Sequence, residues 1–147
     1  MITLKPVQDS DRAVWLPLWR GYEAFYKVDI PDATTSVTWT RILDAAEPIF
    51  AALAWDGDRA VGLVHWIVHR STWTVGDYCY LQDLFVAPDA RGCGLGRQLI
   101  EHVYAAARAA GCQRVYWLTH ETNRDAMMLY DRIADRSGFV QYRKTLD

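Results

Sequence analysis

The spacing of hydrophobic residues divides the chain into a helical beginning, a β-rich middle and an end in which helices and strands alternate. After a short strand over Ile2–Val7, apolar residues recur every three or four positions within Trp15–Tyr26, the period of one helix face. Pro17 is expected to kink this helix or to mark its true start. A second helix is expected over Ser36–Ala45, and Pro48 follows it as a stop.

The middle of the chain predicts three antiparallel strands. Two runs rich in β-formers, Ile49–Trp55 and Arg59–His69, flank Asp56-Gly57-Asp58. Asp-Gly between two such runs is a strong hairpin signal. A looser turn leads to the third strand, Tyr78–Val86.

The last part predicts a helix over 94–111, a strand over Arg114–Thr119, a further helix and a final strand over Phe139–Leu146. Because a helix connects the strand at 114–119 to the one before it, these two strands should pair in parallel. Thr122 and Asp125 fit a capping box at the start of the further helix. The order is β-α-α-β-β-β-α-β-α-β, an α+β fold with a mixed, mostly antiparallel sheet in one domain, 1–147.

Composition removes several classes of function. With 51% hydrophobic and 23% charged residues, the chain is expected to pack a core rather than stay disordered. The 16 Lys and Arg against 18 Asp and Glu argue against nucleic-acid binding. The sequence has neither an apolar run that could span a bilayer nor a secretory signal pattern, so we expect a cytoplasmic protein without membrane contact. Its cysteines and histidines show no metal-ligand spacing, and no metal is expected.

A glycine-rich loop after the third central strand is the most informative segment. In Arg91-Gly-Cys-Gly-Leu-Gly-Arg97, three alternating glycines open a helix between two arginines. Glycines let the backbone approach a ligand closely, and the unpaired amides of a helix N-terminus favour phosphate groups. The spacing G-x-G-x-G is not the dinucleotide fingerprint G-x-G-x-x-G. The loop therefore predicts a pyrophosphate site.

These residues resemble a known family. Arg91-Gly-Cys-Gly94-Leu-Gly96 matches the [QR]-x-x-G-x-[GA] motif of the GNAT superfamily of N-acetyltransferases, and Tyr80–Val86 is similar to that family's central splayed strand. Asn123-x-x-Ala126-x-x-Leu129-Tyr130 matches the family's N-x-x-A-x-x-[LF]-Y helix. The resemblance is strong over about 78–140, and 115–123 and 139–144 resemble the histone/polyamine acetyltransferase branch.

The resemblance implies acetyl-CoA as the co-substrate and a homodimer as a family-level expectation. It implies that the backbone of the central strand pairs with the pantetheine arm and that the loop amides hold the pyrophosphate. The residues expected at the cofactor are Leu84, Phe85, Val86, Arg91, Gly92, Cys93, Gly94, Leu95, Gly96, Arg97, Asn123, Ala126 and Tyr130.

The reaction implied is acetyl transfer to a primary amine, namely a polyamine, an amino acid or a lysine side chain. Tyr130 is the expected catalytic partner of the departing thiolate, because a phenol can protonate it. Gln82 stands where some relatives have Glu, and an amide cannot accept the amine proton, so Asp83 and Glu121 are both candidates for the base. Three alternatives stay open here: an aminoglycoside acceptor, a protein N-terminus, and a non-catalytic acyl-CoA sensor.

Charge is distributed unevenly along the sequence. Residues 1–60 carry nine acids and six bases, whereas residues 61–147 carry nine acids and ten bases. An acidic, aromatic lining that includes Glu23, Asp29 and Asp32 would suit a cationic acceptor, although an ordinary surface helix explains these residues as well. We therefore predict the acceptor near the acidic segment and the cofactor near Arg91 and Arg97.

Overall fold

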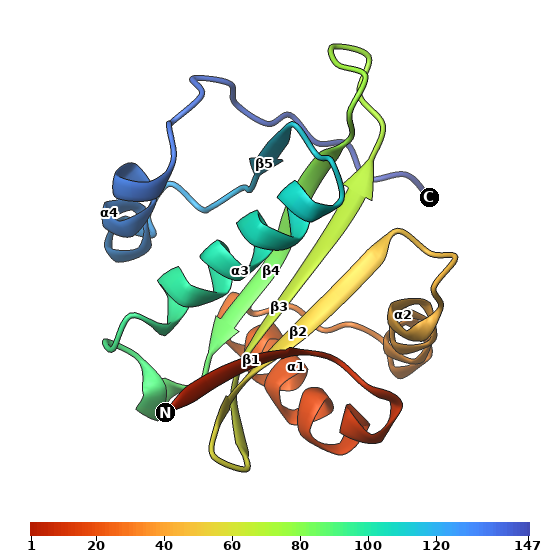
Figure 1. The fold of residues 1–147 in the computed structure, drawn as a ribbon, viewed down its shortest axis with the longest axis vertical. Helices are drawn as coiled ribbons and strands as arrows, with labels where there is room; N and C mark the ends of the chain where they lie inside the picture. The colour runs from red at the N-terminus through yellow and green to blue at the C-terminus, as the bar shows by residue number, and fades with distance from the viewer. The chain divides into compact units, whose positions relative to one another are not determined.

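Five strands form one sheet in the order of the chain in the computed structural model, which describes residues 1–147 (Figure 1). The strands are β1 (Ile2–Pro6), β2 (Ile49–Asp56), β3 (Arg59–His69), β4 (Tyr78–Val86) and β5 (Arg114–Tyr116). The first four pair antiparallel, and β5 pairs with β4 in parallel. The α+β class and the single parallel step predicted from the sequence are confirmed.

The chain divides into two compact units, Met1–Trp117 and Leu118–Asp147, which are described separately. The first unit contains the whole sheet and three helices, α1 (Arg12–Tyr26), α2 (Asp32–Leu43) and α3 (Leu95–Ala109). The second unit contains one helix, α4 (Arg124–Ile133).

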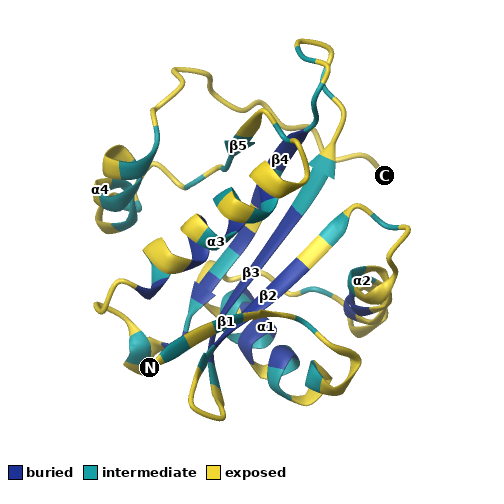
Figure 2. Ribbon diagram, in the orientation of Figure 1, coloured by how far each residue is buried: buried dark blue, intermediate teal, exposed yellow.

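Helices cover both faces of the sheet in the first unit. Leu63 on β3 and Phe85 on β4 lie on the face that packs against Trp15 and Trp19 of α1 and Trp39 of α2. These buried aromatic rings make a dense core, which the dark blue parts of β2, β3, β4 and α1 show in Figure 2.

The opposite face of the sheet carries α3, which approaches the strands closely. Gly62 on β3 makes this possible, because a Cβ atom at this position would lie 3.3 Å from Leu99 and 3.4 Å from Leu95. Leu95, Leu99 and Val103 of α3 are buried at one-turn spacing. Gly111 has a positive φ of 77° beyond the helix end and serves as the predicted C-terminal cap.

Several boundaries differ from the prediction. The helix α1 continues through Pro17, and α2 begins at Asp32 rather than Ser36. The strand β5 stops at Tyr116, three residues earlier than expected. The Thr122 hydroxyl lies 2.7 Å from Nδ1 of His120, so the predicted capping box does not form and α4 begins at Arg124.

The final strand predicted over Phe139–Leu146 is wrong. Residues 135–147 have no regular secondary structure, and the Phe139 and Tyr142 side chains are 80% and 94% exposed. A strand needs a neighbouring strand to pair its backbone groups, and that pairing is non-local. The alternating residues alone could not show whether such a partner is present.

Candidate active site

The strand β4 has a free edge where its two neighbours diverge. It pairs with β3 along its whole length, but it pairs with β5 only over 78–80. His65 pairs with Asp83 while Trp66 pairs with Leu81, so Gln82 is an extra, bulged residue. The stretch 81–86 therefore offers backbone groups that no fifth strand covers, and it includes the predicted Leu84, Phe85 and Val86.

The loop after β4 presents backbone amides. Gly92 and Gly94 have φ values of 82° and 83°, in the region that favours glycine. The first backbone bond at the start of α3 runs from the Gln98 amide to the Gly94 carbonyl, so the amides of Leu95, Gly96 and Arg97 have no acceptor within the helix. Free amides at a helix start favour an anion, and the pyrophosphate site at this loop stays a prediction.

The two arginines of the loop are already engaged through their Nε atoms. Arg91 donates from Nε to the Val86 carbonyl at 3.0 Å, and its guanidinium lies over the Phe25 and Phe85 rings. Arg97 donates from Nε to Glu101 at 2.9 Å. Each contact restrains the guanidinium group of one arginine.

Cys93 contacts the backbone of the preceding turn. Its Sγ lies 2.9 Å from the Ala90 carbonyl oxygen, to which the thiol donates. The thiol is free and exposed.

Asp83 lies beside the free edge of β4 and is buried. Its Oδ2 is 3.0 Å from Nδ1 of His65 on β3, and Nε2 of the same histidine is 3.0 Å from Nε1 of Trp15 on α1. All three residues are buried. A carboxylate, an imidazole and an indole from three elements therefore form one continuous chain of hydrogen bonds.

Tyrosine hydroxyls surround the same carboxylate. Burial raises the pKa of Tyr22, and the charge of Asp83 with its hydrogen bond raises it further. Burial and then Asp83 also raise the pKa values of Tyr26 and Tyr80. All three phenols therefore stay neutral at physiological pH, and Tyr22 donates a hydrogen bond to Asp83.

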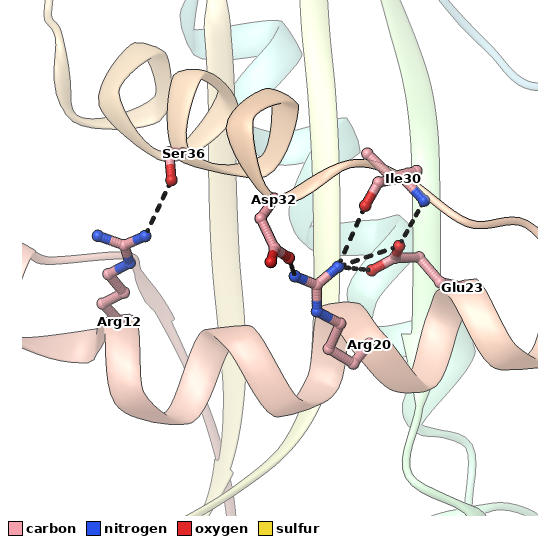
Figure 3. A network of polar contacts seen from close by, with 6 residues as sticks. All are labelled: Arg12, Arg20, Glu23, Ile30, Asp32 and Ser36. Carbon is pink, nitrogen blue, oxygen red and sulfur yellow. Dashed lines mark hydrogen bonds and ion pairs between the residues drawn. The ribbon is translucent and has the colours of Figure 1, made fainter.

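Two of the acidic residues predicted near an acceptor have another role. Glu23 is buried and accepts hydrogen bonds from Arg20 at 3.0 Å and from the Ile30 amide at 2.9 Å (Figure 3). It therefore connects α1 to the segment before α2. Arg20 also pairs with Asp32. Arg20 thus offsets part of the negative charge of Glu23 and Asp32, in agreement with the interpretation as an ordinary helix.

The remaining predicted residues lie in the second unit. Asn123 is the N-cap of α4, and its Nδ2 is 3.4 Å from the Thr119 hydroxyl. Ala126 and Tyr130 lie one turn apart on α4. Glu121 is exposed in the turn before the helix. It lines a shallow hollow with Arg124, Met127, Met128, Asp131 and Arg136.

Sequence reasoning missed two residues of the site, His65 and Trp15. A histidine within the apolar run Val61–Val68 was a signal, because a buried imidazole needs polar partners. Its partners lie 18 and 50 residues away, and only the strand register and the packing of α1 identify them.

Two general features can be stated directly. No group of three or more His, Cys, Asp and Glu side chains is arranged to hold a metal ion. None of the helices has the length and apolar character needed to span a membrane.

Comparison with known proteins identifies the family. The model of the acetyltransferase (GNAT) family matches residues 15–134. The D-amino-acid N-acetyltransferase HPA3 of Saccharomyces cerevisiae is 36% identical over 97% of this chain and 90% of that protein. The thialysine N-epsilon-acetyltransferase of Caenorhabditis elegans is 33% identical over 55% of this chain and 50% of its own length.

A crystal structure of a probable acetyltransferase has the same fold. Its TM-score is 0.87 at 21% identity, with 99% of this chain and 98% of that chain covered. The family match covers most of the sequence, and the predicted GNAT membership is confirmed. The chain belongs to the acetyltransferase (GNAT) family and is an acyltransferase of the N-acetyltransferase class.

Proposed function

We propose that this protein transfers the acetyl group of acetyl-CoA to a primary amine directly, within a ternary complex. The observation that carries the proposal is the position of a buried carboxylate, Asp83, on the strand that also has a free edge and leads into the amide-rich loop. Acetyl-CoA, when bound, supplies the acetyl thioester. The loop amides of 92–97 would hold its pyrophosphate, and the free edge at 84–86 would pair with its pantetheine arm.

The chemistry requires a group that accepts a proton from the amine. A primary amine with a pKa of about 10.4 is protonated at pH 7, and keeping it neutral costs about 4.6 kcal/mol. A carboxylate fixed beside the acceptor lowers this cost by taking the ammonium proton, which frees the nitrogen electron pair to attack the thioester carbon. We assign this role to Asp83 in preference to Glu121, because Asp83 is buried and oriented by His65, whereas Glu121 is exposed.

Tyr130 is proposed as the proton donor to the departing sulfur. A phenol hydroxyl is neutral at pH 7 and donates a hydrogen bond, which suits a group that must stabilise a thiolate. The support for this role is the family motif that places Tyr130 on α4.

The acceptor is proposed to be an amino acid or another small primary amine. The relatives at 36% and 33% identity are named for D-amino acids and for thialysine, each of which carries an amine. A panel of acceptors should therefore begin with D-amino acids and thialysine and continue with polyamines, lysine peptides and an aminoglycoside.

The test measures acetyl-CoA binding and thiol release separately. Acetyl-CoA at about 100 times its dissociation constant should add about 2.7 kcal/mol to the stability, seen as a higher melting temperature. Free thiol should then appear only with an amine from the panel. A melting shift without thiol release for any amine would favour the acyl-CoA sensor, and no shift would reject both functions.

Three variants assign the roles. Asp83→Asn should lower kcat about 100-fold or more, whereas the matched Glu121→Gln should retain most of it. Tyr130→Phe should lower kcat while the melting shift with acetyl-CoA remains. If Glu121→Gln loses activity and Asp83→Asn keeps it, the base has been assigned to the wrong carboxylate.

A further inference from the structure

The hydrogen-bond chain behind Asp83 determines which nitrogen of His65 carries a proton. The indole Nε1 of Trp15 can only donate, so Nε2 of His65, 3.0 Å away, must accept. A neutral imidazole with a bare Nε2 carries its proton on Nδ1, which then donates to Oδ2 of Asp83 at 3.0 Å. Protonation of Nε2 would set two donors against each other inside the core.

From this geometry we infer that His65 and Trp15 are positioning residues for the reaction proposed above: Trp15 fixes the His65 tautomer, and His65 holds Asp83 as an oriented, ionised carboxylate. The inference rests on the proposed function. The pair keeps the proton on Asp83, because Nδ1 of His65 already carries a proton and a second ring proton could bind only at Nε2, where it would break the bond from Trp15.

The Asp83 carboxylate depends strongly on His65, because the other groups near it carry no positive charge. They are Tyr22 and Tyr26 from α1 and Tyr80 from β4, all neutral phenols. Neither lysine nor arginine pairs with Asp83, and its contact with the neutral His65 is a hydrogen bond. Hydrogen-bond donors, rather than a counter-charge, must therefore stabilise the carboxylate.

The proton path follows from the same arrangement. The proton leaves the acceptor nitrogen and forms an O–H bond on Asp83, while the nitrogen keeps its electron pair for the new bond to carbon. Since Nδ1 of His65 is occupied, the proton returns to solvent from Asp83 and is not relayed through the histidine. His65 and Trp15 stay in the same protonation state throughout.

The first experiment observes the tautomer directly in the intact protein. Nitrogen-15 NMR of His65 should show a protonated Nδ1 and an unprotonated Nε2 between pH 6 and 8. Trp15→Phe removes the indole donor, so both neutral tautomers of His65 should become populated. The two nitrogen signals should then move toward each other. Trp19→Phe is the matched control, because Trp19 also packs on His65 but its buried Nε1 has no hydrogen-bond partner.

The second experiment measures the effect on Asp83. His65→Leu removes the donor that orients the carboxylate, and a hydrogen bond to a charged group contributes enough that kcat should fall about 10-fold or more. The pH profile of kcat/KM should also change on its acidic side. His65→Asn retains an amide donor in the place of Nδ1 and should restore most of both.

The outcomes separate this inference from the proposed function. Equal effects of Trp15→Phe and Trp19→Phe, or of His65→Leu and His65→Asn, would overturn the inference, because packing alone would then explain them. An unprotonated Nδ1 in the parent would also overturn it, even with full acetyltransferase activity. A fixed tautomer in a protein that releases no thiol with any amine would instead reject the proposed function and leave the hydrogen-bond assignment intact.

Discussion

Removing the Glu23 carboxylate tests whether this residue holds the fold or contacts the acceptor. Glu23 is only 4% exposed and accepts the Ile30 amide at 2.9 Å and Arg20 at 3.0 Å and 3.2 Å. Glu23→Ala leaves the Ile30 amide without its acceptor, and an unsatisfied buried donor costs about 1–3 kcal/mol. The variant also removes a nearly fully buried side chain, so we expect the upper end, about 3 kcal/mol.

Urea unfolding followed by tryptophan fluorescence measures this loss. With an m-value of about 2 kcal/mol/M, the unfolding midpoint should fall by about 1.5 M. Asp32→Ala is the control, because Asp32 is 92% exposed and a surface ion pair contributes about 1 kcal/mol or less.

The kinetic constants complete the test. If Glu23 is structural, the KM for the amine should stay within about twofold of the parent at a temperature where the variant is folded. Equal destabilisation by Glu23→Ala and Asp32→Ala would refute the structural argument. A large rise in KM with little loss of stability would place Glu23 at the acceptor instead.

The remaining predictions concern the loop and two titrating side chains. Gly94→Ala should lower the stability by about 1 kcal/mol because of the positive φ, and it should reduce the melting shift with acetyl-CoA. The control Gly57→Ala, at a φ of 63° in the β2–β3 turn, should lower the stability as much without affecting that shift. Burial lowers the pKa of His102, so the unfolded chain binds the proton more readily and stability falls as the pH drops below 6.5. The variant His102→Gln should therefore show a smaller change in melting temperature between pH 8 and pH 5. An unchanged slope would contradict this. Because the pKa of Tyr22 is raised in the folded protein, its contribution to stability is lost as the pH rises above 10.0. Between pH 9 and 11 the melting temperature of Tyr22→Phe should therefore fall less than that of the parent.

The features that the sequence determined by itself depend on residues that are close together in the chain. The Asp56-Gly57 turn, the strand periodicity from Ile49 to Val86 and the glycine loop each depend on neighbouring residues, and all appear in the structure where they were predicted. The free amides at the start of α3 likewise follow from the backbone itself. Two short motifs were therefore sufficient to indicate the family, which the match over residues 15–134 confirms.

Contacts between distant residues decided the rest. The sequence marked Asp83 as one of two candidate bases, but only the β3–β4 register sets His65 against it, and only the packing of α1 sets Trp15 against His65. Tertiary packing also showed that Glu23 is a buried partner of Arg20. Residue spacing predicts which face of a helix or strand a side chain occupies, whereas its protonation state and its partner depend on groups that the fold brings together from far along the chain.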